Sequence, residues 1–186
     1  RSTRKESSAA SDVYKRQIFY GLIYTVWLKR STAQNIVIGG AAGALPPVIG
    51  WAAVTASMSI ESIILFSLIF FWTPPHFWAL ALVKSQDYKK AKIPMLPVVA
   101  GGNEARKQIF IYSIIMVGIS LLPNFIGMAK MLYGSVAGIS GFIFLVLAFQ
   151  LFRQPDDNRA MRLFKYSIAY LFILFSALIC DEIILG

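Results

Sequence analysis

The chain has 186 residues, 57% of them hydrophobic, and its apolar runs approach the roughly 20 residues that a helix needs to cross a bilayer. This composition excludes an ordinary soluble domain and indicates a membrane protein. The formal net charge of +9 could suggest nucleic-acid binding, but the Lys and Arg residues lie in short loops between apolar runs. That distribution is typical of membrane topology, so we expect no nucleic-acid partner.

Residues 1–17 differ from the rest of the chain. They are rich in Ser, Lys and Arg and contain no apolar stretch of the kind that a signal peptide has. The apolar run that follows, over residues 18–28, is about half as long as a membrane span. We interpret 1–17 as a non-native or disordered tail and 18–186 as the transmembrane domain, which begins with a truncated helix.

Five further apolar runs predict membrane-spanning helices, over residues 34–54, 60–83, 109–122, 131–152 and 166–185. Pro46-Pro47 is expected to kink or end the first of these five, and Pro74-Pro75 to interrupt the second, because proline removes a helical hydrogen bond. Pro123 is expected to end the third. The spacing Gly39-x-x-x-Gly43 predicts a close approach of another helix. The fold class is therefore an all-α transmembrane bundle of about six helices.

The basic residues alternate between the two sides of this bundle. They follow the span 18–28 (Lys29, Arg30), the span 60–83 (Lys84, Lys89, Lys90, Lys92, Arg106, Lys107) and the span 131–152 (Arg153, Arg159, Arg162, Lys165). The positive-inside rule places these loops in the cytoplasm, or in the matrix of a mitochondrion. The tail 1–17, with five Lys and Arg residues, falls on the opposite side and breaks the rule.

The segment 72–97 carries the chemically distinctive residues. It contains the only histidine, His76, directly after the proline pair, and it ends in a lysine-rich loop that holds Asp87. Ionisable residues inside a membrane are costly and are usually functional. A proline-broken helix that leads into a charged loop therefore suggests a site at the membrane surface.

Four stretches of sequence resemble the intramembrane aromatic prenyltransferases, and among them the protohaem farnesyltransferases. They are Tyr-Thr-Val-Trp-Leu-Lys-Arg (24–30) with Thr32 and Asn35, Gly-Ala-Leu-Pro-Pro-Val-Ile-Gly-Trp (43–51), Trp-Thr-Pro-Pro-His-Phe-Trp-Ala-Leu (72–80), and Asp87-Tyr88 followed by Ala-Lys-Ile-Pro-Met-Leu-Pro-Val-Val (91–99). Members of this family have nine helices and another acidic motif near their start, Asn-x-x-x-Asp-x-x-x-Asp, which these residues lack. We therefore expect three N-terminal helices to be missing.

The resemblance implies the transfer of a farnesyl group from farnesyl diphosphate to protohaem, with Mg²⁺, giving haem O and diphosphate. It implies a bacterial cytoplasmic membrane or a mitochondrial inner membrane, contact with membrane lipid, and haem A synthase or terminal-oxidase assembly factors as protein partners. Because the other acidic motif is absent, we expect the 186-residue chain to be inactive alone.

The resemblance also implies roles for single residues. Asp87 would bind Mg²⁺ and act in catalysis, with Tyr88 and Lys92 beside it, although a loop with one carboxylate departs from the Asp-rich motif of related enzymes. Lys29, Arg30, Thr32 and Asn35 would bind the diphosphate, and His76 would face the porphyrin as an iron ligand or an acid/base group.

Each of these residues also has a simpler interpretation. Asp87 could merely balance a basic loop, and Lys29 and Arg30 could be topology charges that extend to the membrane surface. His76 could bond a carbonyl freed by the prolines and share that task with Thr73. Two other functions remain open: a related prenyltransferase acting on a quinone precursor, and a six-span transporter. A transporter predicts an inverted repeat, which the sequence does not contain.

Overall fold

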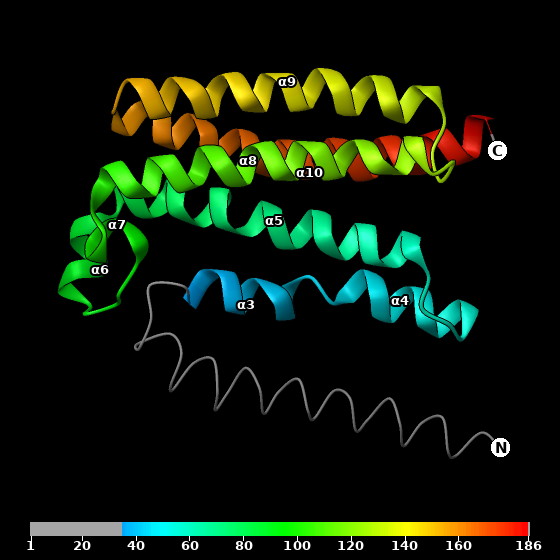
Figure 1. Ribbon diagram of the computed structural model, residues 1–186, viewed down its shortest axis with the longest axis horizontal. Helices are drawn as coiled ribbons and strands as arrows, with labels where there is room; N and C mark the ends of the chain where they lie inside the picture. Colours follow the sequence, from blue (N-terminus) through cyan, green and yellow to red (C-terminus); the bar gives the residue numbers. More distant parts are fainter. Residues whose placement is uncertain (1–34, 186) are drawn as a thin grey trace, which may run out of the picture.

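The computed structural model describes residues 35–185, with side chains from Ile36 to Ile184. Every regular element in this range is an α-helix (Figure 1): α3 (Asn35–Gly43), α4 (Pro46–Thr55), α5 (Ile60–Val83), α6 (Ser85–Lys90), α7 (Leu96–Val99), α8 (Gly101–Phe125), α9 (Met131–Arg153) and α10 (Asp157–Leu185). The predicted tail 1–17 and the predicted span 18–28 lie outside the described residues.

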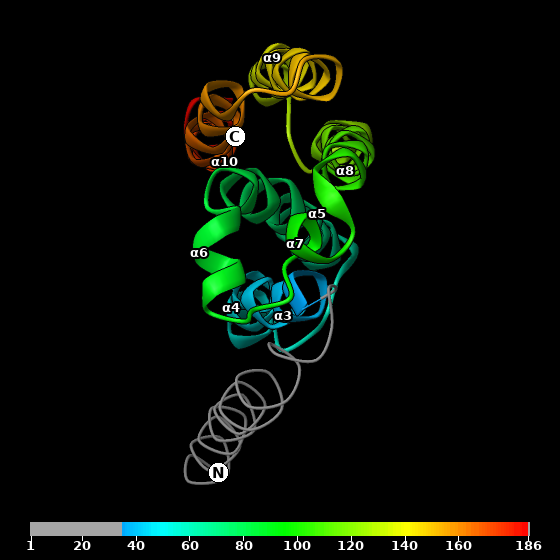
Figure 2. The same ribbon diagram turned by 90° about the vertical axis from the view of Figure 1, so that its left-hand side faces the viewer.

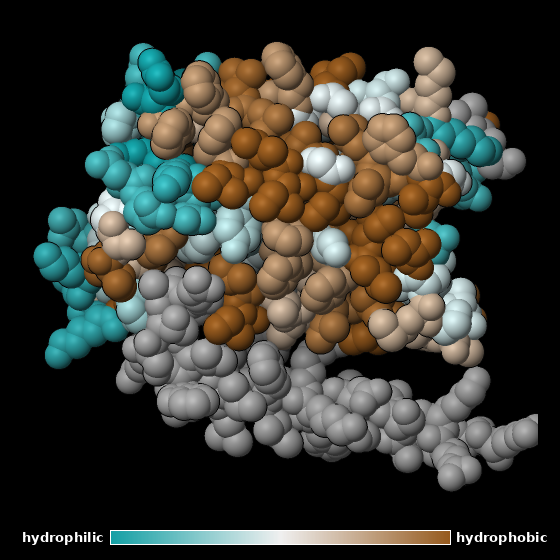
Figure 3. Space-filling model, viewed as in Figure 1, coloured by the Kyte–Doolittle hydropathy of each residue, from teal (hydrophilic) through white to brown (hydrophobic). Residues whose placement is uncertain are grey.

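Five segments of the described chain are long and apolar enough to cross a membrane. They are Ile36–Thr55, Ile60–Val83, Gly101–Phe125, Met131–Arg153 and Asp157–Ile184. Apolar side chains cover the middle of the face shown in Figure 3, whereas polar side chains gather at the end where α6 lies. The prediction of an all-α transmembrane bundle is confirmed, and each of the five predicted spans in this range corresponds to one of these segments.

The two proline pairs have different effects on the helices. Pro46 and Pro47 occupy the first positions of α4, where a missing N–H group matters least, and the chain between α3 and α4 leaves the helix at Ala44 and Leu45. In contrast, α5 runs without interruption through Pro74 and Pro75. The prediction of a break there was wrong: proline has a helical φ, and packing on both sides of the pair keeps the helix continuous despite two lost hydrogen bonds.

Helices α8 and α10 are longer than predicted. The first begins at Gly101 rather than near 109 and continues past Pro123 to Phe125, and the second begins at Asp157 rather than near 166. The added turns are polar, with charged residues such as Glu104, Arg106 and Arg159. Hydropathy identifies only the part of a helix that lies inside hydrocarbon, so it does not predict the polar helical turns that project from the membrane.

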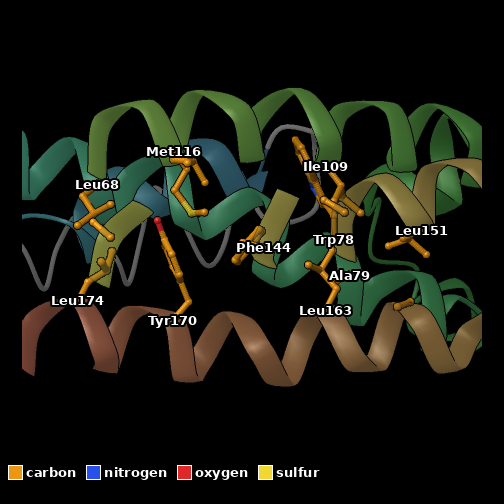
Figure 4. Packing of buried hydrophobic residues seen from close by; sticks show 14 of the residues in the cluster. Leu68, Trp78, Ala79, Ile109, Met116, Phe144, Leu151, Leu163, Tyr170 and Leu174 are labelled. Carbon is orange, nitrogen blue, oxygen red and sulfur yellow. The ribbon is translucent and has the colours of Figure 1, made fainter. Parts of the chain in front are cut away.

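Four long helices enclose the core. Helix α5 packs against α8 and α10, both of which pack against α9, and α3 and α4 lie on the opposite side of α5 (Figure 2). The core between the four helices contains large side chains from each of them, including Leu68, Ile109, Phe144, Leu163 and Leu174 (Figure 4).

The core also contains hydrogen-bonded polar groups. The Tyr133 hydroxyl donates to the Ser120 carbonyl at 2.8 Å, and the Tyr170 hydroxyl donates to the Ser120 hydroxyl oxygen at 2.9 Å. The Ser120 hydroxyl in turn donates to the Val117 carbonyl at 2.7 Å. These bonds join α8, α9 and α10, and they satisfy groups that would be costly to bury alone.

A buried carboxylate from α10 caps the start of α9. The Asp181 side chain is 1% exposed and accepts hydrogen bonds from the backbone N–H groups of Lys130 and of Tyr133, the latter at 3.2 Å. Lys130 is the N-cap residue of α9, so these donors belong to the helix end that lacks intrahelical partners. The negative charge also favours the positive end of the helix dipole. Asp181 thereby joins the last described helix to the one before it.

Replacing Asp181 by Ala should lower the free energy of unfolding by about 2 kcal/mol, because two backbone N–H groups lose their buried acceptor. Asp181→Asn keeps one acceptor oxygen and should cost less. The free energy can be measured by reversible unfolding in mixed micelles. Glu182→Ala removes an exposed carboxylate next to it and should change stability by less than about 0.5 kcal/mol. Equal losses at the two positions would rule out the cap.

Single-cysteine labelling tests the orientation of the bundle. In a Cys180→Ser background, an impermeant maleimide should label Lys90→Cys and Gln154→Cys from the cytoplasmic or matrix side, because the basic loops are expected to lie there. Met131→Cys, at the first residue of α9, should react only from the opposite side, because α9 begins at the other end of the bundle from α6. Labelling of Lys90→Cys and Gln154→Cys from different sides would contradict this topology.

Candidate functional site

The short helix α6 places Asp87 at the basic end of the bundle. This helix follows α5 after a single residue, Lys84, whose Nζ lies 3.6 Å from Asp87 Oδ2. The side chains of Lys84 and Asp87 are 55% and 67% exposed. An ion pair this exposed contributes little to stability, so the Asp87 carboxylate remains accessible to another cation.

The turn after α6 folds back on it. The N–H of Ile93 donates to the Tyr88 carbonyl at 3.0 Å, and the N–H of Lys92 donates to the Lys89 carbonyl at 3.2 Å. Lys92 has a φ of +54°, a left-handed conformation that is unusual for a residue other than glycine. Tyr88 packs against the core, whereas the Lys92 side chain is exposed. Asp87, Tyr88 and Lys92 therefore lie in one compact helix and turn.

His76 is enclosed by aromatic rings. Its ring stacks on Trp72 at a centroid distance of 4.3 Å and on Phe164 of α10 at 4.7 Å, and it meets Phe77 edge to face at 5.0 Å. Both faces of the imidazole are therefore covered, and a ligand could reach only its edge. Trp72 is also fixed in place, because its Nε1–H group donates to the Ser167 carbonyl at 2.8 Å.

Ser167 determines which nitrogen of His76 carries the proton. The Ser167 hydroxyl lies 2.6 Å from the Phe164 carbonyl, to which it donates, and 2.7 Å from His76 Nδ1. A serine hydroxyl has one proton, and the carbonyl can only accept it. With that proton directed to the carbonyl, the bond between the two side chains is assigned as His76 Nδ1–H donating to the Ser167 oxygen, which leaves Nε2 of the neutral ring with a lone pair.

This arrangement differs from the simpler interpretation of His76. The sequence suggested that His76 bonds a carbonyl freed by the prolines, with help from Thr73. Instead, His76 is paired with Ser167 on α10, and the Thr73 hydroxyl donates to the Ile69 carbonyl within its own helix at 2.8 Å.

An apolar cavity lies beside this aromatic group, between α3 and α5. Its volume is about 290 Å³, and it is lined by Ile36, Gly39, Gly40, Gly43, Ile69, Trp72, Thr73 and Phe77. A Cβ atom added to Gly40 would lie 3.1 Å from Thr73, so α3 can approach α5 this closely only because the residue is glycine. The sequence predicted such an approach at Gly39 and Gly43; the contact shown is at the neighbouring Gly40, so the prediction for those two glycines stays a prediction.

A second, polar cavity lies at the basic end. It has a volume of about 480 Å³, and its lining includes Ser85, Arg106, Asp156 and Asp157. Asp156 and Asp157 belong to a loop that follows Asp87 two spans later in the sequence. The fold brings that loop to the beginning of α6, so this end of the bundle contains more carboxylates than Asp87 alone.

The predicted site residues divide into three groups. Asp87, Tyr88 and Lys92 lie together at the basic end. His76 lies deeper in the bundle, about 12 Å along the axis of α5 from Lys84 at a rise of ~1.5 Å per residue. Lys29, Arg30 and Thr32 lie outside the described residues. Asn35 begins α3, and its side chain is not described.

The described residues by themselves do not form a metal site. Over 35–185, no group of three or more His, Cys, Asp or Glu side chains is arranged to hold an ion. Mg²⁺ is usually bound by one or two carboxylates together with water and substrate phosphates. Asp87 fits one of those positions, and any further protein ligand would have to come from other residues.

The profile of the UbiA prenyltransferase family matches residues 17–176. The chain belongs to this family. It is an integral membrane protein with several helical spans, in agreement with the fold. Family membership excludes the transporter alternative.

Two curated relatives from bacteria are similar to this chain. The chain is 56% identical to protoheme IX farnesyltransferase of Parvibaculum lavamentivorans, over 89% of this chain and 54% of the relative. It is 56% identical to the enzyme of the same name from Methylobacterium nodulans, over 89% and 53%. The chain thus spans about half the length of the curated relatives it matches.

A solved structure supports the UbiA fold independently of close sequence similarity. It comes from work on "the biosynthesis of Digeranylgeranylglyceryl phosphate synthase in membranes", and it superposes with a TM-score of 0.78 at 17% identity. The match covers 90% of this chain and 59% of the other. At this identity the likeness concerns the fold alone.

Sequence reasoning missed Ser167 entirely. A serine in an apolar helix commonly bonds its own backbone, so nothing in the sequence distinguishes it from Ser113, which donates to the Ile109 carbonyl in that way. Ser167 differs only through its contacts with Trp72 and His76, which lie more than 90 residues earlier in the chain.

His76 is the only histidine, so ¹⁵N-histidine labelling gives the nitrogen signals of one imidazole. In the detergent-solubilised chain, Nδ1 should show the shift of a protonated nitrogen and Nε2 that of an unprotonated one, because Ser167 accepts from Nδ1. Ser167→Ala should remove this preference and move both signals. Ser113→Ala, at an equally buried serine, should leave them unchanged. A proton on Nε2 in the unmodified chain would refute the assignment.

Proposed function

We propose that this chain takes part in the transfer of a farnesyl group from farnesyl diphosphate to protohaem, giving haem O and diphosphate. The main support is the identity of 56% with protoheme IX farnesyltransferases over nine-tenths of the chain. At that level of identity the residues that line a site are expected to be shared as well as the fold. The geometry also supports the proposal, because the imidazole of His76 lies inside the bundle and the carboxylate of Asp87 lies at the basic end of the bundle.

The diphosphate is assigned to the basic end. Asp87 lies there in a helix with exposed lysines, and Lys92 is held on the same turn by the folded-back backbone. Lysine attracts phosphate oxygens as a point charge, and Tyr88 can donate a hydrogen bond from its hydroxyl. Lys29, Arg30, Thr32 and Asn35 remain proposed contacts of the same diphosphate on the strength of the sequence resemblance.

The metal ion implied by the family resemblance is Mg²⁺. When bound, it would neutralise the charge that develops on the leaving diphosphate. Asp87 would supply one carboxylate ligand, and its high exposure leaves it free to do so. The cations of this end attract the anion without a metal, so binding of farnesyl diphosphate and its ionisation are separable steps.

The porphyrin is assigned to the interior beside His76. In the proposed reaction the allylic C–O bond breaks, its electron pair leaves with diphosphate, and the vinyl π electrons form the new C–C bond. A water molecule adds to the resulting carbocation and loses a proton, which supplies the hydroxyl group of haem O, so each turnover needs one water and a proton acceptor. Nε2 of His76 has the lone pair to accept that proton, or else to bind the haem iron.

A related prenyltransferase acting on a quinone precursor would have the same fold. The proposed function differs from it by the acceptor, and the relatives named above are protoheme farnesyltransferases. Incubation with farnesyl diphosphate and each acceptor separates the two: a prenylated aromatic acid without haem O would favour the quinone enzyme.

The test compares the 186-residue chain with the same chain joined to the N-terminal half of the Parvibaculum relative. With farnesyl diphosphate, protohaem and Mg²⁺, the joined protein should form haem O, detected by chromatography and mass spectrometry, whereas the chain alone should form none. In the joined protein, Asp87→Asn should lower turnover about 100-fold, because one metal ligand is worth several kcal/mol in the transition state.

Asp157→Asn is the matched control, since it neutralises another exposed carboxylate at the same end. It should keep most of the activity. Haem O formed by the chain alone, or a large loss at Asp157 and none at Asp87, would show that the catalytic carboxylates are misassigned. Absence of haem O from a folded joined protein that binds both substrates would contradict the proposed function itself.

A further inference from the structure

A basic hollow lies between α9 and α10, apart from the groups assigned above. It is formed by the last turns of α9 and the first turns of α10 and has a volume of about 980 Å³. Its lining consists of Phe149, Gln150, Arg153, Gln154, Asp156, Asn158, Arg159, Met161, Arg162 and Lys165. Neither Asp87 nor His76 contributes to it.

The hollow has a large excess of positive charge. Four cations, Arg153, Arg159, Arg162 and Lys165, face one carboxylate, Asp156, which leaves a net charge of +3. In the described part of the chain the ion pair within 4.0 Å is Lys84–Asp87, so none of these four cations forms such a pair with a carboxylate of residues 36–184. Such a group of cations favours an anionic ligand from outside the chain.

The length of α10 places the hollow at the depth of lipid phosphates. The spanning segment Asp157–Ile184 has 28 residues, or about 42 Å of helix, whereas the hydrocarbon core is only ~30 Å thick. The apolar part, residues 166–184, accounts for about 28 Å at ~1.5 Å per residue. The basic turns 157–165 therefore stand in the head-group layer.

The types of residue in the hollow suit a phospholipid. Arginine binds phosphate through a planar fork of donors, which lysine lacks, and three of the four cations are arginines. Gln150, Gln154 and Asn158 add amide donors for ester and glycerol oxygens. Phe149 and Met161 provide apolar surface where the acyl chains of a lipid would begin. The α6 segment, by contrast, offers only lysines around Asp87.

We propose that this hollow binds the head group of an anionic phospholipid, and preferentially one with two phosphates, such as a diphosphatidylglycerol. Two phosphate charges balance the net charge of +3 better than one. The pair α9 and α10 lies at the side of the bundle away from α3 and α4 (Figure 2). Basic pockets between membrane helices are known to bind such lipids on the side of the positive loops. The site is independent of the proposed catalytic function.

The experiment is native mass spectrometry of the detergent-solubilised chain titrated with diphosphatidylglycerol, phosphatidylglycerol or phosphatidylcholine. We expect one lipid bound per chain, with affinity decreasing in that order. The double variant Arg159→Gln/Arg162→Gln should weaken binding of diphosphatidylglycerol at least about 10-fold, because it removes two charge-assisted contacts. Arg162 is exposed and Arg159 is partly exposed. An unchanged melting temperature of the double variant in neutral detergent would show that it is folded.

The matched control is Lys89→Gln/Lys90→Gln, which removes the same charge from α6 at the same end of the bundle. It should change lipid affinity by less than about 2-fold, as expected for general screening rather than a site. Equal losses in the two double variants would overturn the proposal in favour of nonspecific attraction. Competition by free inorganic diphosphate at equal concentration would instead identify a site for soluble phosphates and overturn the lipid assignment.

Discussion

A buried polar group in a membrane-spanning bundle must find its partner within the protein, because the surrounding hydrocarbon offers none. This constraint accounts for the contacts that specify how the described helices pack. The hydroxyls of Tyr133 and Tyr170 converge on Ser120, and Asp181 accepts from the start of α9. His76 and Trp72 of α5 both bond to Ser167 of α10. Apolar packing alone leaves several rotations of a helix about its own axis similar in energy, whereas these hydrogen bonds form in only one of them.

The candidate site depends on the same constraint. A continuous α5 connects the interior, where His76 lies, to the surface, where α6 begins, so the two proposed halves of the site are held at a fixed separation along one axis. Ser167 then fixes the proton on His76 Nδ1, which gives the ring a defined orientation and a defined reactive edge. The exposed carboxylate of Asp87 and the enclosed imidazole of His76 thus differ in solvation, as the binding of a charged diphosphate and of a large apolar acceptor would require.

Much of this fold could be predicted from the sequence, because length and hydropathy determine where a helix crosses a membrane. The limits of α8 and α10 could not, since their first turns are polar and are helical only as extensions of a packed span. Pro74 and Pro75 were expected to break α5, but their effect depends on packing that the sequence does not show. Asp87 and His76 could be identified as candidate site residues because ionisable residues are rare in such a chain. Ser167 and the position of Asp156 depend on contacts between distant segments, which local patterns do not encode.

The dependence of His76 and Trp72 on α10 has a consequence for biosynthesis. A polypeptide enters the membrane in the order of its synthesis, so α5 is inserted well before α10 leaves the ribosome. During that interval the imidazole and the indole lack the Ser167 partner, and α9 lacks its Asp181 cap. The nascent protein therefore cannot hold the histidine in its final orientation until its last described helix has been delivered. Incomplete chains released by the ribosome before α10 is made would leave this centre unassembled.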